Sequence, residues 1–413
     1  MKLSDFDSVL FLGVGGVSMH QIADACLAQN KTVFGYDMKH NSYIDMLTKK
    51  GMHFSTSFNK SFLSVDLCIK TGAISDNNKY VTRLRDLGVK IIDRAEALSM
   101  LSREFKTVIA VAGTHGKSTT ASLIYEILRA SHKKVSCHIG ADVYAPRFKL
   151  GDDYLVVEAC EYNKSFLSLY PDISVVTNVE SEHMDSYGNL FNLRTAFQVF
   201  LRRAKTRFVM QDNSTEYLHK LNNVNMVAID QDCNIKPKIS GEHNLKNISL
   251  ALAVVDTLGV ERDIAIQVIN KFEGVSRRYQ YIGQYREIKL YIDYAHHPTE
   301  IRAFYEIFSQ EHDKNIFVFQ PHTYSRTKYL LKDFVRVLSA IPNLIIYKEY
   351  PAREKRWQGM TAYELYKVVK KINPNTRYSA SQKTILKNVS NISSIAFVGA
   401  GDINQVAMTF KKK

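Results

Sequence analysis

The sequence predicts an α/β protein made of parallel, Rossmann-like sheets, with about three units along its 413 residues. Short apolar runs rich in β-branched residues alternate with segments of helical periodicity, as buried parallel strands and their crossover helices do. Glycine-rich or polar turns follow several of these strands directly. In α/β sheets the ligands bind at such strand ends, so the turns are the first places to search for function.

Composition is that of an ordinary globular chain, with 45% hydrophobic and 23% charged residues. No apolar run approaches the roughly 18 residues of a membrane span. The acidic opening MKLSDFD does not fit a signal peptide. Five scattered cysteines without a CxxC pair indicate neither a disulfide framework nor a zinc site, and fit a reducing compartment. We therefore expect a cytoplasmic protein with no membrane partner.

The formal net charge of +14 raises nucleic-acid binding as one interpretation. The basic residues are spread along the chain, however, and only the last three lysines form a run. We favour solvated lysines and expect no nucleic-acid partner. A moderate positive field would also help to collect anionic nucleotides. For the oligomeric state we expect a monomer or a weak homodimer.

The first unit begins with a βαβ pattern: an apolar strand at 8–12, a helix at 19–28 and a strand at 32–36 that ends at Asp37. The turn between the first strand and the helix is GVGGVS, residues 13–18. This resembles the dinucleotide fingerprint, with Ser18 in place of its third glycine. NAD binding is therefore one interpretation. Asp37 could contact a nucleotide or cap a turn at the strand end.

The second unit is centred on a strand at 107–112, the loop GTHGKST and an amphipathic helix. Such a loop aims backbone N–H groups and the helix dipole at one point, which suits phosphate. Lys117 would reach the β- and γ-phosphates, and the Ser118 hydroxyl would hold Mg²⁺. The loop departs from the common P-loop pattern, which has a glycine at the position of Val111.

Further polar residues follow the strands and open a helix of this unit. Glu158, at the end of the strand 154–157, is the expected Mg²⁺ carboxylate, and Glu161 is a weaker candidate. Near the helix at 248–258, His243, Asn244 and Asn247 share one face of a first turn. Their amides can bond the adenine edge, although Asn244 could simply cap the helix.

The third unit has strands at 290–292 and 316–319 that lead into DYAHHPTE and QPHTYSRT. Further strands are predicted at 344–347 and 395–398. Loops rich in His and Arg at the ends of parallel strands indicate the crevice of a doubly wound sheet. The adjacent histidines of HHP do not predict a metal site, because no third ligand lies at helical spacing.

Several stretches together resemble the Mur ligases, which build the peptide stem of the bacterial cell wall. These stretches are GVGGVSMHQIA, GTHGKST, EACEYNKSFL, TNVESEHMD, GEHNLKN, SRRY, DYAHHPTE and FQPHTYSRT, and they span nearly the whole chain. The resemblance implies a three-domain architecture: a Rossmann-like N-terminal domain at 1–103, a P-loop ATPase domain at 104–278 and a Rossmann-like C-terminal domain at 279–413.

The resemblance also implies a role for each matching residue. UDP-N-acetylmuramate would bind at Gly13, Gly15, Gly16, Val17, Ser18, Asp37, Thr71 and Ala73. ATP would bind at Gly113, Thr114, His115, Gly116, Lys117, Ser118, Thr119, His243, Asn244, Asn247, Arg278 and Asp293. Metal would bind at Ser118, Glu158 and His183, and the amino acid, L-alanine, at Tyr294, His296, His322 and Arg326. Lys117, Glu158, His183 and Arg278 would carry catalysis, with Arg278 on the γ-phosphate.

The implied reaction is an ATP- and Mg²⁺-dependent ligation of a carboxylate to an amine through an acyl phosphate. Two departures from relatives stand out: no lysine lies near Gln198, so we expect no carbamylated lysine, and Thr323 stands where many relatives have arginine. Three alternatives remain open. They are an NAD-dependent oxidoreductase, a nucleotide-sensing module without catalysis, and a related ligase that attaches a recycled stem peptide.

Overall fold

The chain divides into two compact units in the computed structural model. The first comprises Met1–Lys238 and Asn244–Phe272, and the second Ile239–His243 and Glu273–Lys413. The structure describes all residues except 141–147, 150, 353, 357–358, 386–390 and 412–413. Within the described residues, no helix combines the length and the apolar character needed to cross a membrane.

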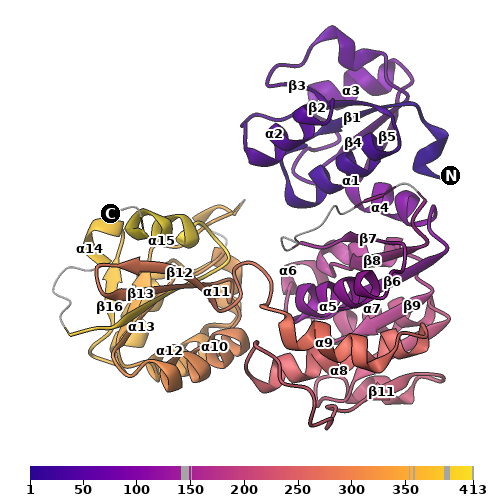
Figure 1. The fold of residues 1–413 in the computed structure, drawn as a ribbon. Helices are drawn as coiled ribbons and strands as arrows, with labels where there is room; N and C mark the ends of the chain where they lie inside the picture. The colour runs from indigo at the N-terminus through magenta and orange to yellow at the C-terminus, as the bar shows by residue number, and fades with distance from the viewer. Residues whose placement is uncertain (141–147, 150, 353, 357–358, 386–390, 412–413) are drawn as a thin grey trace. The chain divides into compact units, whose positions relative to one another are not determined.

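The first unit contains two parallel sheets (Figure 1). The N-terminal sheet has the strand order β3-β2-β1-β4-β5, and all its pairings are parallel. Its elements are η1 (Leu3–Asp5), β1 (Ser8–Leu12), α1 (Val17–Ala28), β2 (Thr32–Tyr36), α2 (Ser42–Lys49), β3 (His53–Ser55), η2 (Lys60–Leu63), β4 (Leu67–Lys70), α3 (Lys79–Asp86), β5 (Lys90–Asp93) and α4 (Arg94–Ser102). The chain reverses direction across the sheet at β1, which makes the turn after β1 a switch point.

The second sheet of this unit has the order β11-β10-β9-β6-β8-β7 and is also entirely parallel. Its elements are β6 (Thr107–Ala112), α5 (Lys117–Ala130), β7 (Val135–His138), β8 (Tyr154–Glu158), η3 (Tyr162–Ser168), β9 (Ile173–Val176), α6 (Met184–Tyr187), α7 (Leu190–Arg202), β10 (Thr206–Met210), η4 (Glu216–Lys220), β11 (Asn225–Val227), α8 (Glu242–Thr257) and α9 (Arg262–Lys271). Here the order reverses at β6, so the glycine loop occupies the switch point.

The second unit contains one sheet with the order β12-β13-β17-β14-β15-β16. Among the strands that the structure describes in this sheet, only β12 runs antiparallel to its neighbour. The elements are β12 (Gln280–Tyr285), β13 (Ile288–Asp293), α10 (Pro298–Glu311), β14 (Asn315–Phe319), α11 (Tyr324–Tyr329), α12 (Leu331–Ser339), β15 (Leu344–Tyr347), α13 (Ala362–Lys370), β16 (Arg377–Ser379), α14 (Gln382–Ile385), β17 (Ser394–Val398) and α15 (Ile403–Lys411). Two buried apolar clusters, one on Phe304, Phe308 and Phe317 and one on Ile316, Phe397 and Phe410, make up its core.

Strand register brings the functional turns of each sheet to one edge. In the second sheet Val111 pairs with both Glu158 and Val175, so β6, β8 and β9 end together. In the second unit Val398 pairs with Asp293 and with Phe319, which aligns the ends of β13, β17 and β14. The predicted α/β class with three mainly parallel sheets is confirmed. The antiparallel β12 was not predicted, because its sequence has no clear alternation.

Candidate active site

The glycine loop after β6 is held in place by the turn that follows β9. Asn178 accepts a hydrogen bond from the His115 N–H through Oδ1 (2.9 Å) and donates to the His115 carbonyl through Nδ2 (3.1 Å). Thr177 Oγ1 donates to the same carbonyl at 2.5 Å. Gly113 has φ of +144°, and a Cβ there would overlap Thr177 Oγ1. Glycine is therefore required by both the backbone conformation and the close approach.

Gly116 ends the loop and caps α5 in the left-handed conformation, with φ of +81°. A Cβ at this position would overlap the side-chain oxygen of Asn247. The common P-loop has a glycine at the position of Val111. Here Val111 is fully buried in β6 and pairs with Glu158 and Val175. The glycine loop therefore begins at Gly113, directly after the end of β6.

Lys117 lies at the centre of a buried ionic cluster. Its Nζ donates to the carbonyls of Gly113 (2.5 Å) and Thr114 (2.9 Å) and lies 3.1 Å from Glu161 Oε2. The Glu161 side chain is only 2% exposed, and the Nε2 of His183 lies 3.5 Å from its other oxygen. Burial alone would raise the pKa of Glu161, but Lys117 and His183 lower it below its ordinary value. Glu161 is therefore held as a carboxylate.

Ser118 and Glu158 form the second pair at the phosphate end of the loop. The Ser118 hydroxyl donates to Glu158 Oε2 at 2.8 Å, and the backbone N–H of Gly140 donates to the same oxygen at 2.8 Å. A hydroxyl and a carboxylate side by side are oxygen ligands of the kind Mg²⁺ prefers. The residues predicted to bind metal thus fall into two pairs: Ser118 with Glu158, and His183 with Glu161.

The start of α8 lies partly behind the glycine loop. Asn247 is 5% exposed, and its Oδ1 accepts from Thr120 Oγ1 at 3.2 Å while its Nδ2 donates to Asn244 at 3.4 Å. In this structure the Asn247 amide therefore supports α5. His243 is exposed and belongs to the second unit, whereas Asn244 and Asn247 belong to the first. Their contacts to adenine stay a prediction.

The turn after β1 is built around Gly13 and Gly15. Gly13 has φ of +86°, and a Cβ would overlap the Thr71 side chain. Asp37 Oδ2 accepts a hydrogen bond from the Gly15 N–H at 2.9 Å, and Asn41 Nδ2 donates to the Gly15 carbonyl at 2.9 Å. Asp37 therefore fixes the turn, as the alternative interpretation of this residue proposes, and its contact to uridine stays a prediction.

The start of α1 carries the remaining residues of the predicted sugar-nucleotide turn. Gly16 is the N-cap of α1 without a side-chain cap, and Val17 is 42% exposed. Ser18 Oγ lies 2.8 Å from His138 Nε2 and accepts from Arg94 at 3.0 Å. Ala73 lies exposed in the turn after β4, beside Thr71.

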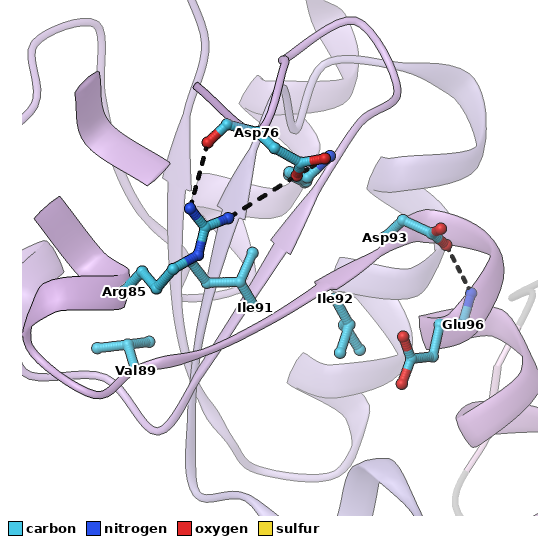
Figure 2. A pocket seen from close by; sticks show the side chains of 8 residues that line it. Asp76, Arg85, Val89, Ile91, Ile92, Asp93 and Glu96 are labelled. Carbon is cyan, nitrogen blue, oxygen red and sulfur yellow. Dashed lines mark hydrogen bonds and ion pairs between the residues drawn. The ribbon is translucent and has the colours of Figure 1, made fainter. Parts of the chain in front are cut away.

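A separate cavity of about 280 Å³ lies beside β4 and β5 (Figure 2). Four of its charged side chains are already paired or capping. Asp76 lies 3.2 Å from Lys70 and 4.0 Å from Arg85, and Asp93 accepts from the Glu96 N–H at 2.9 Å. Lys70, Asp76, Arg85 and Asp93 are thus engaged within the protein, and we assign the cavity no function.

In the second unit, Arg278 and Asp293 lie close to the end of β13. Both Asp293 oxygens accept backbone hydrogen bonds, from Tyr279 N–H at 2.7 Å and from Ala295 N–H at 2.6 Å. Burial raises the pKa of Asp293 to about 6, an effect that Arg278 and these amides only partly offset. Arg278 Nη1 donates to Glu300 at 3.2 Å. Asp293 thus ties the linker to the strand end, and its ATP contact stays a prediction.

The four residues predicted to bind the amino acid lie in two neighbouring loops. The Tyr294 and His296 rings are 5.3 Å apart, and His296 and His322 are 6.0 Å apart. Arg326 Nη1 lies 2.9 Å from His322 Nδ1 and donates to the His322 carbonyl at 3.2 Å. The structure therefore brings Tyr294, His296, His322 and Arg326 into one cluster.

Thr323 is strained, with φ of +66° and ψ of +147°. The Thr323 N–H donates to the Tyr350 carbonyl at 2.9 Å, and the Thr323 carbonyl accepts from Thr327 Oγ1 at 2.8 Å. The surrounding bonds hold this costly conformation, as is common at functional sites. Tyr350 also stacks on His322 at 5.6 Å.

Sequence reasoning missed several residues that complete these sites. Glu161 ranked below Glu158, although it is the acid that contacts Lys117 and His183. Asn178, His138, Arg94, Glu300 and Tyr350 were not singled out. The signal for Asn178 was available, because it follows the end of a predicted strand, as Glu158 does. The contacts of His138 and Arg94 join segments far apart in the chain, and no local pattern predicts them.

A glycine loop at a switch point, with a lysine opening the next helix and a carboxylate ending the neighbouring strand, defines a P-loop nucleotide-binding protein. Comparison with known families makes this specific. Residues 8–106 match the Mur ligase family, catalytic domain, residues 111–229 the Mur ligase middle domain, and residues 277–401 the Mur ligase, glutamate ligase domain. The chain belongs to the Mur ligase family.

Relatives of known function cover nearly the whole chain. The UDP-N-acetylmuramate–L-alanine ligase of Caldicellulosiruptor bescii is 34% identical, over 98% of this chain and 98% of its own. The enzyme of that name from Caldanaerobacter subterraneus is 33% identical, over 99% and 98% of the two chains.

Solved structures share the fold. The UDP-N-acetylmuramate-alanine ligase of Thermotoga maritima superposes with a TM-score of 0.81 at 23% identity, covering 98% of each chain. A murein peptide ligase of Psychrobacter arcticus superposes with a TM-score of 0.70 at 19% identity, again covering 98% of each chain.

Proposed function

We propose that this chain ligates L-alanine to the carboxylate of UDP-N-acetylmuramate, with ATP converted to ADP and phosphate, in the synthesis of peptidoglycan precursors. The full-length identity of 34% to a ligase of this activity carries the proposal. The arrangement of Lys117, Ser118 and Glu158 at the β6 switch point supports it from the geometry. Because the substrates are free nucleotides and an amino acid, we expect a cytoplasmic enzyme.

The proposed division of labour follows the three sheets, with boundaries at 1–103, 104–278 and 279–413. The turn after β1, with Gly15 and Asp37, binds the sugar nucleotide. The loop from Gly113 to Thr119 binds ATP, with adenine near Asn244 and Asn247 and with Arg278 on the γ-phosphate. The cluster of Tyr294, His296, His322 and Arg326 binds L-alanine, with Arg326 on its carboxylate.

The chemistry has two steps. A muramyl carboxylate oxygen attacks the γ-phosphorus, the bond to the bridging oxygen breaks, and ADP leaves. The neutral amine of L-alanine then attacks the acyl carbon and loses a proton. The bond between the acyl carbon and the muramyl oxygen that attacked the γ-phosphorus breaks, and this oxygen leaves as part of the released phosphate. Lys117 and Arg278 offset the negative charge on the transferring phosphoryl group. No serine or cysteine nucleophile takes part.

Magnesium fits the residues present. Ser118, Glu158 and His183 would hold it, and Glu161 offers a further carboxylate beside His183. The oxygen donors suit Mg²⁺, and the bound ion would supply positive charge beside the phosphates. In the structure Lys117 makes contacts to Glu161 and to two loop carbonyls. ATP binding must redirect this side chain toward phosphate.

An isotope experiment tests the proposed chemistry directly. UDP-N-acetylmuramate labelled with ¹⁸O in its carboxylate is incubated with the enzyme, ATP, Mg²⁺ and L-alanine. An acyl phosphate requires that one labelled oxygen appear in the released phosphate, as measured by mass spectrometry. Unlabelled phosphate together with the ligated product would contradict the acyl-phosphate route. Absence of the product would contradict the proposed function itself.

A further inference from the structure

A short bridge within the first unit connects the sugar-nucleotide turn to the metal carboxylate. It is the segment 138–140, which begins at the last residue of β7 and which we name the β7 bridge. Its first residue, His138, is 5% exposed and contacts Ser18 near the start of α1. Its last residue, Gly140, donates its N–H to Glu158 Oε2.

The contact to α1 has two layers. Ser18 Oγ lies 2.8 Å from His138 Nε2 and also accepts from Arg94 Nη1 at 3.0 Å. One helical turn further, the fully buried Gln21 donates to the Ile139 carbonyl at 2.8 Å and accepts from the Ile139 N–H at 3.1 Å. Ser18 and Gln21, three residues apart on α1, therefore contact two consecutive residues of the bridge, His138 and Ile139.

The other end of the bridge reaches the phosphate side. His138 pairs with Val157, the residue before Glu158, in the parallel register of β7 and β8. Glu158 Oε2 receives both the Gly140 N–H and the Ser118 hydroxyl at 2.8 Å. A continuous set of hydrogen bonds thus runs from α1 through the β7 bridge to Glu158 and Ser118.

We infer that Ser18 and His138 are positioning residues for the ligation, acting through the β7 bridge to fix the sugar-nucleotide turn against the ATP sheet. This inference rests on the proposed function. The first N–H groups of α1 have no intrahelical partner and face a diphosphate in that proposal, with Arg94 adding positive charge beside them. Their position relative to Glu158 decides whether the muramyl carboxylate reaches the γ-phosphate, and small displacements of reacting groups are costly.

The test compares His138→Val and Ser18→Ala with the wild type. His138→Val removes the contact to Ser18, and Ser18→Ala removes that contact together with the bond from Arg94. We expect kcat/KM for UDP-N-acetylmuramate to fall at least about tenfold in each variant while KM for ATP stays unchanged. The double variant should lose little more than Ser18→Ala alone, because the contact that His138→Val removes is already absent in Ser18→Ala. His138→Gln places an amide where Nε2 lies and should recover part of the loss.

Ser99→Ala is the matched control. Ser99 Oγ donates to the Ser168 carbonyl at 2.6 Å, a hydrogen bond that joins the same two parts of the unit and involves neither α1 nor the β7 bridge. It should lower the thermal midpoint yet leave kcat/KM for the sugar nucleotide unchanged. An equal loss in Ser99→Ala, or none in His138→Val, would overturn the inference. Calorimetric binding of UDP-N-acetylmuramate to the wild type tests the proposed function separately.

Discussion

At the scale of single residues, Lys117 has a second role that its position in a loop motif does not reveal. It is the expected phosphate contact, and it also neutralises Glu161, which is 2% exposed. A buried carboxylate left without its partner is strongly destabilising. A lysine that faced only a phosphate site could be removed without loss of the fold, and the contact of Lys117 to Glu161 argues against this.

We expect Lys117→Ala to reduce turnover at least about a hundredfold and to destabilise the first unit by about 3 kcal/mol. Adding Glu161→Gln should restore much of the stability, because no buried charge remains unpaired, but none of the activity. Phosphate release and thermal unfolding measure the two effects. Turnover comparable to that of the wild type would remove Lys117 from the nucleotide site.

Asp293 gives a prediction of pH dependence. Its folded pKa of about 6 lies above its ordinary value of 3.8, so the folded protein binds the proton more tightly than the unfolded chain. The contribution of this group to stability is therefore fully present below about pH 4 and is lost as the pH rises to about 6, amounting to about 3 kcal/mol.

Asp293→Asn isolates this effect, because asparagine does not titrate. Scanning calorimetry should show the thermal midpoint of the wild type falling relative to that of the variant between about pH 4 and pH 6. Above about pH 6 the difference between the two midpoints should stay constant. The opposite slope would mean that Arg278 and the amides of Tyr279 and Ala295 outweigh burial and hold the carboxylate ionised.

At the scale of elements, the loop between β6 and α5 requires glycine both for its backbone conformation and for the close approach of a neighbouring side chain. A turn on the surface requires glycine for its backbone conformation alone. Gly116 and Gly88 both have left-handed backbones, with φ of +81° and +78°. A Cβ at Gly88 meets nothing within 4 Å, whereas one at Gly116 would overlap Asn247. Alanine at Gly88 therefore introduces backbone strain alone, whereas alanine at Gly116 introduces the same strain and also displaces Asn247 of α8.

We expect Gly88→Ala to cost about 1 kcal/mol of stability and to leave KM for ATP unchanged. Gly116→Ala should cost more and should weaken ATP binding at least about tenfold, because the loop or Asn247 must move. Titration with a non-hydrolysable ATP analogue measures the difference. Equal affinities in the two variants would show that Asn247 does not constrain the loop.

Local patterns were sufficient for most elements that carry the turns. The strands at 8–12, 32–36, 107–112 and 344–347 match β1, β2, β6 and β15 in both bounds. The glycine loop could be predicted because strand, loop and helix are contiguous. The pairing of Lys117 with Glu161, and of Ser18 with His138, could not be, because each depends on which strands become neighbours in the folded sheet.

At the scale of the whole molecule, the first sheet decides between a ligase and an oxidoreductase. Its GVGGVS turn resembles a dinucleotide fingerprint, yet Ser18 stands at the third glycine and contacts His138 and Arg94. The match of residues 8–106 to the Mur ligase family favours the ligase. We expect calorimetry on the full chain to detect UDP-N-acetylmuramate binding and no NADH binding. Saturable NADH binding displaced by the sugar nucleotide would support the oxidoreductase.

The amino donor depends on the second unit, where Arg326 contacts His322 and the His296 ring lies next to that of His322. If Tyr294, His296 and His322 close over the α-carbon, they leave room for a methyl group and little more. A pocket of this kind discriminates by only about 1–3 kcal/mol per methylene, so glycine and L-serine should be slow substrates. Arg326→Ala should raise KM for L-alanine, because its guanidinium is the proposed carboxylate contact.

The most direct measurement is phosphate release with UDP-N-acetylmuramate, ATP and Mg²⁺, comparing L-alanine, glycine, L-serine and the stem tripeptide at matched concentrations. The wild-type enzyme should show its highest kcat/KM with L-alanine, a reduced value with glycine and L-serine, and little release with the tripeptide, whose distant carboxylates need more cations than Arg326 provides. A highest kcat/KM with the tripeptide would contradict the alanine assignment and make the chain a peptide-recycling ligase.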